Sequence, residues 1–152
     1  MTKKEANLYY AGLFDGEGCV MIAKRKIPDT GRPSYQVRAA IAMVDIAPLE
    51  RLKHIYGIGS LYSAGRTKLA VMKAWQWVVA SRVACEFFKQ ILPYSITKRE
   101  EMLLAIHFQD YITKNRYTHR KVFTNQPESV SQYKEECYLK MKALKTRFPH
   151  HP

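Results

Sequence analysis

The stretch from residue 10 to residue 18 is YAGLFDGEG, and the rest of the chain is interpreted around it. Gly12 and Gly16 lie four residues apart, so in a helix they share one face. Each glycine costs a helix about 1 kcal/mol relative to alanine, and a close approach by a second helix is the natural compensation. A helix C-cap explains Gly16 or Gly18 but leaves Gly12 unexplained. The stretch therefore predicts a helix that packs closely against another helix, such as its own copy in a second subunit.

Two acidic residues, Asp15 and Glu17, lie at the C-terminal end of the same predicted helix. Carboxylates are disfavoured there, because the helix macrodipole already presents its negative end. If two copies of the helix pair through Gly12 and Gly16, both Glu17 side chains approach one two-fold axis. They then repel each other unless a divalent cation lies between them. The alternative is that Asp15 and Glu17 are two solvated residues of a turn.

On the C-terminal side of this stretch the period of the apolar residues alternates between that of a strand and that of a helix. Pro48 suits a first helical turn, Gly57 suits a left-handed C-cap, and Pro93 ends a helix. The predicted elements are a helix over residues 4–16, strands Cys19–Ile27 and Tyr35–Val44, a helix over 47–56, strands Ser60–Ala64 and Leu69–Val79 around Gly65, and a helix over 81–91.

The C-terminal part is predicted to be helical. Thr97 and Glu100 have the spacing of a capping box for a helix that reaches about Lys114, and a second amphipathic helix runs from about Glu128 to Lys145. At 152 residues we expect a single domain, 1–152, with a core over about 4–91 and a helical part over about 97–146. The fold class is α+β, with an αββαββα core. Its two hairpins form one four-stranded antiparallel sheet that helices cover on one face only.

The charge of the chain indicates an acidic partner. Twenty-five Lys and Arg against thirteen Asp and Glu give a net charge of +12, more than solubility requires. Nucleic acid is the first candidate, and a merely well-solvated surface or a basic ribosomal-type protein is the alternative. Charge alone separates neither DNA from RNA nor binding from catalysis.

Three widely spaced cysteines, Cys19, Cys85 and Cys137, indicate neither a disulfide framework nor a zinc finger, and they suit a reducing compartment. We find no secretory signal and no stretch of eighteen uncharged apolar residues. The expectation is an intracellular, soluble protein with no membrane association. It would be cytoplasmic in a prokaryote, or organellar if an organelle encodes it.

Residues 10–18 resemble the LAGLIDADG motif, with matches at Ala11, Gly12, Leu13, Asp15 and Gly18 and variants at Tyr10, Phe14, Gly16 and Glu17. The order of elements over about 4–91 is similar to the core of that family. The resemblance implies an intron-encoded homing endonuclease that hydrolyses DNA phosphodiester bonds with Mg²⁺ and needs no small-molecule cofactor. It also implies that Glu17, with the adjacent Gly16, binds the metal, while Asp15 mainly supports the end of the helix. Since the short chain holds one motif, a homodimer is expected, with an interface that includes Ala11, Gly12, Asp15 and Gly16.

Two further residues are catalytic candidates. Lys98 matches the place where the family keeps a basic residue, just before the helix that follows the core; the alternative is an exposed lysine in the first turn. Asp45 stands at the end of the second strand, where a polar residue holds solvent near the metal, and it could equally cap the next helix. A metal that activates water and stabilises the phosphate oxygens removes the need for a protein nucleophile.

The alternation along the hairpins predicts how duplex DNA is bound. Val20, Ile22, Val37, Ala39, Ile41 and Met43 face the helices, so the other parity faces outward. Residues expected to contact bases are Arg25, Gln36, Arg38, Tyr62, Arg66, Lys68 and Gln76. Residues expected to contact phosphates are Lys24, Lys26, Arg32, Arg116, His119, Arg120 and Lys121. A dimer with strands of this length covers about 20 base pairs of a pseudo-palindromic target. The alternative for these residues is that they are only solvated strand positions.

Two other functions fit parts of the sequence. The first is an RNA-binding intron maturase, which the resemblance implies for some members of the family, but RNA binding requires neither Glu17 nor a metal. The second is a basic, non-enzymatic protein of a ribonucleoprotein, for which the Gly12 and Gly16 pattern would be a coincidence.

Overall fold

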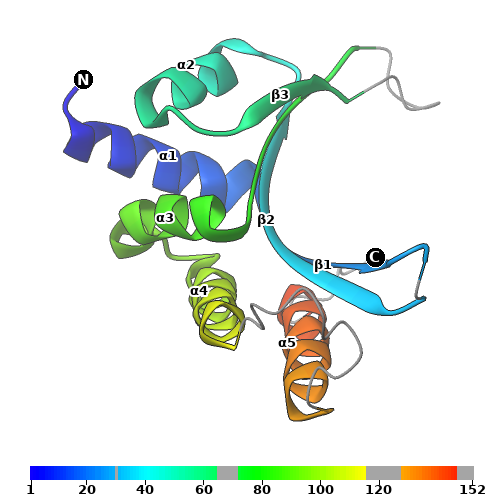
Figure 1. The fold of residues 1–152 in the computed structure, drawn as a ribbon. Helices are drawn as coiled ribbons and strands as arrows, with labels where there is room; N and C mark the ends of the chain where they lie inside the picture. Colours follow the sequence, from blue (N-terminus) through cyan, green and yellow to red (C-terminus); the bar gives the residue numbers. More distant parts are fainter. Residues whose placement is uncertain (30, 65–71, 116–127, 147–152) are drawn as a thin grey trace.

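The computed structural model describes residues 1–29, 31–64, 72–115 and 128–146 (Figure 1). Its elements in chain order are α1 (Lys3–Glu17), β1 (Gly18–Lys26), β2 (Pro33–Met43), α2 (Ala47–Tyr56), β3 (Ser60–Ser63), β4 (Trp75–Ala80), α3 (Ser81–Ile91), the short 3-10 helix η1 (Leu92–Tyr94), α4 (Arg99–Lys114) and α5 (Glu128–Lys145). The αββαββα order predicted from the sequence is confirmed, with C-terminal helices after it.

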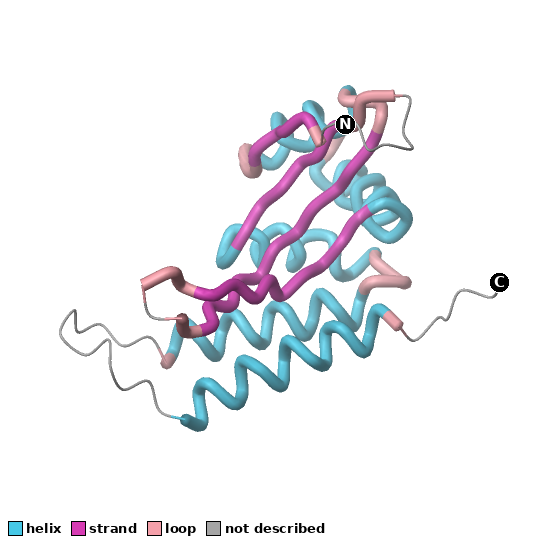
Figure 2. Tube along the Cα trace, turned by 90° about the vertical axis from the view of Figure 1, so that its right-hand side faces the viewer, coloured by secondary structure: helices cyan, strands magenta, loops and turns pink. Residues whose placement is uncertain are grey.

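The four strands form one antiparallel sheet in the order β1-β2-β4-β3. The sheet curves, with α1, α2 and α3 on one side of it (Figure 1), while the strands lie in front of the helices when the other side faces the viewer (Figure 2). The predicted inward parity is correct, because Val20, Ile22, Val37, Ala39 and Ile41 are all buried. The α+β fold class, with helices on one face of the sheet, is therefore confirmed.

Helix α1 lies at the centre of the core. A capping box starts it, in which the Thr2 side chain accepts from Glu5 N–H and the Glu5 carboxylate accepts from Thr2 N–H. Tyr10 and Phe14, one turn apart, are wholly buried, and the Phe14 ring lies 5.7 Å from the rings of Phe87 and Phe88 on α3. This packing orients α1 so that its C-terminal end meets the beginning of β1.

The last glycine of the motif is required within a single subunit. A Cβ atom at Gly18 would overlap the ring and the carbonyl oxygen of Phe14, so only glycine allows the chain to pass directly from α1 into β1. Gly57 is also explained, since it ends α2 with a φ of 65°, the left-handed C-cap that the sequence predicts.

Two sequence predictions differ from the structure. The predicted strand Leu69–Val79 is shorter, because β4 begins at Trp75 and residues 65–71 lie outside the described part of the chain. The N-cap of α4 is Lys98 rather than Thr97, and the backbone N–H groups of residues 96–98 donate to the Asp15 side chain of α1.

The C-terminal helices α4 and α5 lie side by side along one end of the sheet (Figure 2). The rings of Tyr111 on α4 and Tyr133 on α5 are 3.8 Å apart. None of the helices within the described ranges is both long and apolar enough to cross a membrane.

Candidate active site and nucleic-acid interface

Asp15 ties the end of α1 to the beginning of α4. Its carboxylate accepts hydrogen bonds from the Ser95 hydroxyl (2.5 Å) and from the backbone N–H groups of Ile96 (2.7 Å), Thr97 (3.2 Å) and Lys98 (3.1 Å). Burial alone would raise the pKa of this carboxyl, but these hydrogen bonds outweigh it and lower the pKa below its usual value. The resemblance implies that Asp15 mainly supports the end of the motif helix, and in the structure its carboxylate satisfies N–H groups at the start of another helix.

This contact brings two predicted site residues to one end of α1. Lys98 is half-buried and its backbone is bonded to Asp15, while Glu17 stands two residues after Asp15 as the last residue of the helix. No basic residue occupies the last turn of α1. The Glu17 carboxylate is therefore exposed at the negative end of a helix that lacks a compensating cation of its own.

Glu17 and Asp45 line the same pocket, which has a volume of about 450 Å³ and is completed by Ala42, Met43, Val44 and Ala74. Asp45 Oδ1 also accepts a hydrogen bond of 3.0 Å from Ala47 N–H. Of the two roles considered for Asp45, the contact at the start of α2 is thus present, and this contact holds the carboxylate beside the pocket. A role in catalysis stays a prediction.

The donor chemistry at Glu17 suits half of a divalent-metal site. Within the described ranges no three His, Cys, Asp or Glu residues come together to hold a metal. Mg²⁺ in proteins often keeps several waters and binds one or two carboxylates. A Glu17 carboxylate, the backbone oxygen of Gly16 and a second Glu17 from another copy match that requirement, whereas one isolated carboxylate matches it poorly.

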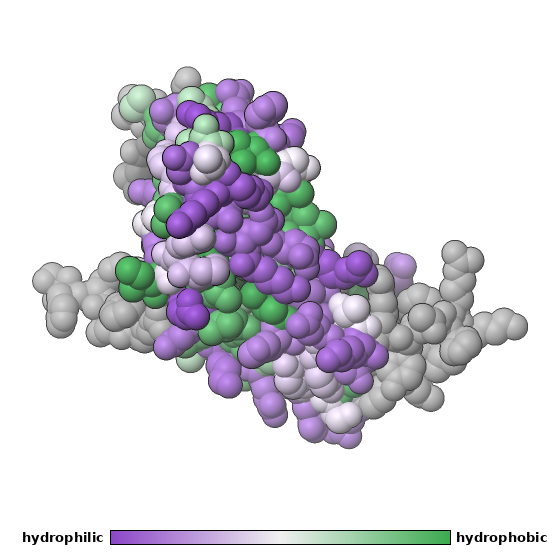
Figure 3. All heavy atoms as spheres, turned by 90° about the vertical axis from the view of Figure 1, so that its left-hand side faces the viewer, coloured by the Kyte–Doolittle hydropathy of each residue, from purple (hydrophilic) through white to green (hydrophobic). Residues whose placement is uncertain are grey.

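One face of α1 has no partner within the described chain. A Cβ added at Gly12 or Gly16 would meet nothing within 4 Å, so the subunit itself does not explain these glycines. Leu8 and Tyr9 on the same helix are each 48% exposed, and Ile96 in the loop held by Asp15 is 87% exposed. Hydrophobic residues come to the surface among hydrophilic ones on this helical side of the molecule (Figure 3).

The prediction of Ala11 as an interface residue is wrong. Its side chain is wholly buried in the core of its own subunit, on the same side of α1 as Tyr10 and Phe14, so a second subunit has no access to it. Asp15 directs its carboxylate to its own loop, and only its placement next to Gly16 keeps it among the interface candidates.

The uncovered face of the sheet carries the predicted base-contacting residues that the structure describes. Arg25, Gln36 and Arg38 share the outward parity of the first hairpin, and Gln76 lies opposite both Ala42 and Tyr62 in the second. Gln36 Nε2 donates to the Ser81 hydroxyl (3.2 Å), and Arg38 Nε is buried without a partner among the described residues. Arg66 and Lys68 lie outside the described residues.

The predicted phosphate contacts divide into three groups. Lys26 and Arg32 are exposed near the tip of the first hairpin. Arg116, His119, Arg120 and Lys121 lie outside the described residues. Lys24 pairs with a carboxylate: its ammonium lies 2.7 Å from Glu135 on the helix-covered side of the sheet and close to the rings of Tyr35 and Tyr138, and its contact with phosphate stays a prediction.

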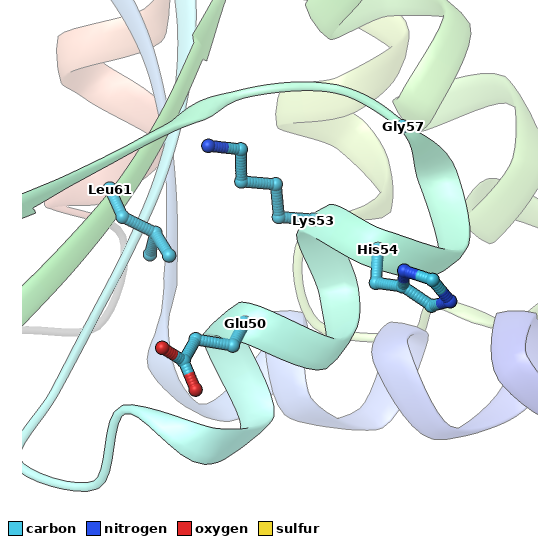
Figure 4. Close-up of a pocket in the computed structure, with 5 residues that line it drawn as sticks. All are labelled: Glu50, Lys53, His54, Gly57 and Leu61. Atoms are coloured by element: carbon cyan, nitrogen blue, oxygen red, sulfur yellow. The ribbon is translucent and has the colours of Figure 1, made fainter.

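A larger pocket elsewhere has no connection with these residues. It has a volume of about 530 Å³ and is lined by Glu50, Lys53, His54 and Gly57 of α2 and its C-cap together with Leu61 of β3 (Figure 4). None of the predicted catalytic, metal-binding or DNA-binding residues lines it.

Solved structures of homing endonucleases share this fold. The homing endonuclease I-CvuI, crystallised with DNA in the presence of Mg and of Ca, superposes with a TM-score of 0.77 in the Mg complex, at 16% identity over 99% of this chain and 87% of its own. The archaeal intron-encoded enzyme I-Vdi141I, bound to DNA, gives 0.75 at 14% identity over 99% and 91%. The LAGLIDADG homing endonuclease I-GzeII, bound to its DNA target, gives 0.68 at 20% identity over 95% of this chain and 49% of its own. No family model and no curated protein sequence matches the chain. The fold is therefore that of LAGLIDADG homing endonucleases.

Proposed function

We propose that this chain is a site-specific DNA endonuclease of the homing type, which cleaves both strands of a long target as a homodimer. One observation carries the proposal: in a fold shared with LAGLIDADG homing endonucleases, the motif helix ends at an exposed carboxylate, Glu17, beside a sheet face that none of the described helices covers. No observation favours the RNA-binding alternative, and the solved structures compared above hold DNA.

The residues near the end of α1 would have distinct roles in the reaction. Glu17 would bind a divalent cation together with the backbone oxygen of Gly16. When bound, that cation supplies Lewis-acid stabilisation of the phosphate oxygens and lowers the pKa of an attacking water. Lys98, held near by Asp15, would stabilise negative charge on the scissile phosphate. Asp45 would orient solvent at the pocket that it shares with Glu17.

The open face of α1 supports a two-fold contact between copies. Gly12 and Gly16 leave room for the backbone of another helix, and Leu8 and Tyr9 add apolar surface on that helix. A two-fold axis beside these glycines brings two Glu17 carboxylates together, each from one subunit. Two active sites, each with one Glu17, would then act on the two strands of one duplex.

The uncovered sheet face would lie against the major groove. Arginine and glutamine side chains can form paired hydrogen bonds with guanine and adenine, so Arg25, Gln36, Arg38 and Gln76 are suited to contact bases. Strand β2 has 11 residues; at ~3.3 Å per residue such a strand spans about 36 Å, roughly one turn of duplex per subunit. Two subunits would cover about 20 base pairs. An enzyme of this kind acts where its genome lies, in a prokaryotic cytoplasm or in an organelle.

The experiment that tests this function is selection from a randomised duplex library in Mg²⁺, followed by sequencing of the cleaved ends. We expect an enriched pseudo-palindromic target of about 20 base pairs and cuts on both strands at its centre. Addition of a chelator should stop the cleavage and leave binding in place. Duplexes that are bound but never cut with Mg²⁺ present, or cuts without any sequence preference, would contradict the proposal.

A further inference from the structure

Helix α5 runs along the open edge of β1, which is the outermost strand of the sheet. Two contacts fix its direction: Glu135 pairs with Lys24 near the tip of the hairpin, and Lys145 Nζ lies 3.3 Å from Cys19 Sγ near the beginning of the strand. The helical stretch from Glu135 to Lys145 rises about 15 Å, and the strand from Cys19 to Lys24 extends about 17 Å. Because these lengths agree, α5 lies antiparallel to β1 and alongside it over this whole distance.

The two contacts lie on opposite faces of the sheet. Lys24 has the parity of Val20 and Ile22, which face the core, whereas Cys19 has the outward parity. The Lys145 side chain therefore reaches around the edge of β1 toward the uncovered face. The last turn of α5 places the Lys145 ammonium next to a strand residue only two positions after Glu17.

A basic groove of about 300 Å³ separates α5 from β1. No carboxylate lines it, and its cations are Lys24, Arg25, Lys142 and Lys145. Lys24 is neutralised by Glu135, but neither Lys142 nor Lys145 forms an ion pair within the described chain. Lys145 donates to sulfur, which is a weak acceptor, and Lys142 lies 5.5 Å from the centre of the Tyr138 ring. These two ammonium groups thus have donors available for a stronger acceptor.

We propose that this groove binds one phosphate backbone of the DNA target, with Lys145 at the phosphates nearest to Glu17 and Lys142 at phosphates farther from it. The proposal rests on the function proposed above. It adds a phosphate-binding surface at the edge of the sheet, beyond the surface that the strands themselves provide. From Cys19 to Arg25 the strand extends about 20 Å, which corresponds to the rise of about six base pairs along the duplex axis. Phosphate oxygens are the strong, charged acceptors that unpaired lysine ammonium groups require.

The first test compares Lys145→Ala with Lys140→Ala on duplex DNA. Both remove one positive charge from α5, but Lys140 is exposed and does not line the groove. We expect Lys145→Ala to reduce the slope of log K against log salt by about 1.8 per dimer, because each phosphate contact contributes ~0.9 and the residue occurs twice. Lys140→Ala should keep the wild-type slope, and Lys145→Arg should restore it. Equal slopes for the two alanine variants would overturn the proposal.

A second measurement uses the wild-type chain. Cys19 is the one partly exposed cysteine, whereas Cys85 and Cys137 are buried and serve as internal controls. We expect bound duplex to slow alkylation of Cys19 by iodoacetamide at least tenfold and to leave the other two unreactive. Alkylation at the same rate with DNA bound overturns the groove while the endonuclease proposal stands. A chain that binds no duplex at all overturns both.

Discussion

At the scale of single residues, Asp15 links the motif to the rest of the site. Its carboxylate accepts four hydrogen bonds from residues 95–98 and places Lys98 at the end of α1. The sequence indicates the acid but not its partners, because they lie 80 or more positions away. The N-cap at Lys98 differs from the predicted Thr97 for the same reason: the N–H groups before α4 bind to a side chain that no local pattern reveals.

We predict that Asp15→Asn destabilises the fold by about 2 kcal/mol, because hydrogen bonds to a charged acceptor are lost and an amide N–H₂ is brought against N–H donors. Since the pKa of Asp15 is lowered in the folded chain, its contribution is present above the ordinary aspartate pKa and is lost as pH falls through the lowered value. The difference in unfolding free energy between variant and wild type should therefore shrink in acid. Urea titrations at several pH values measure it.

The exposed Asp110→Asn variant on α4 is the matched control, and it should stay within about 0.5 kcal/mol of wild type. If Asp15→Asn is no less stable than Asp110→Asn at neutral pH, then Asp15 does not hold residues 95–98 in solution.

The alternation of apolar and polar residues along the first hairpin correctly predicted most of its outward-facing residues. The same alternation assigns Lys24 to the inward-facing set. Arg25 and Gln36 have the outward parity and are exposed on the uncovered side. Lys24 has the parity of the core residue Ile22, which is consistent with its contact on the covered side of the sheet. Its actual partner, Glu135, lies on a helix that local reasoning places in the sequence but not in space.

At the scale of elements, the sequence predicts the ends of the first three helices and of the first hairpin to within two residues. In these segments the spacing of the apolar residues and the positions of glycine and proline indicate the same boundaries. The contact of Tyr10 OH with Pro48 O (3.0 Å) and the packing of Phe14 on α3 then decide how these elements assemble. The position of α5 was not predictable, because an amphipathic pattern indicates which side of a helix is buried but not which element it packs against. The contacts with Lys24 and Cys19 place α5 against β1.

We predict that Glu135→Gln loosens α5 from the hairpin. Glu135 accepts from Lys24 and from the Tyr35 hydroxyl; these bonds lower the pKa of Glu135 and raise the pKa of Lys24. The ion pair is thus strongest at pH values between the pKa of Glu135 and the pKa of Lys24. It is lost as pH falls through the lowered Glu135 pKa and as pH rises through the raised Lys24 pKa. Amide hydrogen exchange should accelerate in α5 and stay unchanged in α1.

The neighbouring exposed residue provides the control for this change. Glu136→Gln removes the same charge from α5 without touching the hairpin, and its exchange rates should match those of wild type. Identical protection of α5 in the two variants would show that the ion pair does not hold the helix.

At the scale of the whole molecule, we propose that the face of α1 that carries Gly12 and Gly16 connects assembly with catalysis. In one subunit these glycines meet open space, so the fold does not require them. The isolated chain also provides one Glu17 where a divalent cation needs further ligands. Pairing of two copies would account for both observations, and it stays a prediction, which the spacing of the glycines already indicates.

We predict that Gly12→Val breaks the dimer and abolishes cleavage while each subunit stays folded. Within a subunit the new side chain meets nothing within 4 Å, and valine is a better helix former than glycine. At a two-fold contact the added methyl groups occur twice and cost about 1 to 3 kcal/mol per site. Sedimentation at micromolar concentration should show a monomer, and circular dichroism a helix content like that of wild type.

The control adds a valine to an exposed position on another helix, Gln132→Val on α5, and should remain a dimer. If Gly12→Val sediments as a stable dimer that still cuts both strands, this face of α1 is not the interface.

The most direct test of the account measures binding and cleavage of the selected target by Glu17→Gln beside wild type, with Mg²⁺ present. The variant removes one negative charge from the end of α1 and touches no outward residue of the sheet. We expect the variant to bind the duplex with an affinity equal to or slightly above that of wild type and to cut neither strand. Mg²⁺-dependent cleavage by Glu17→Gln at the wild-type rate would contradict this expectation.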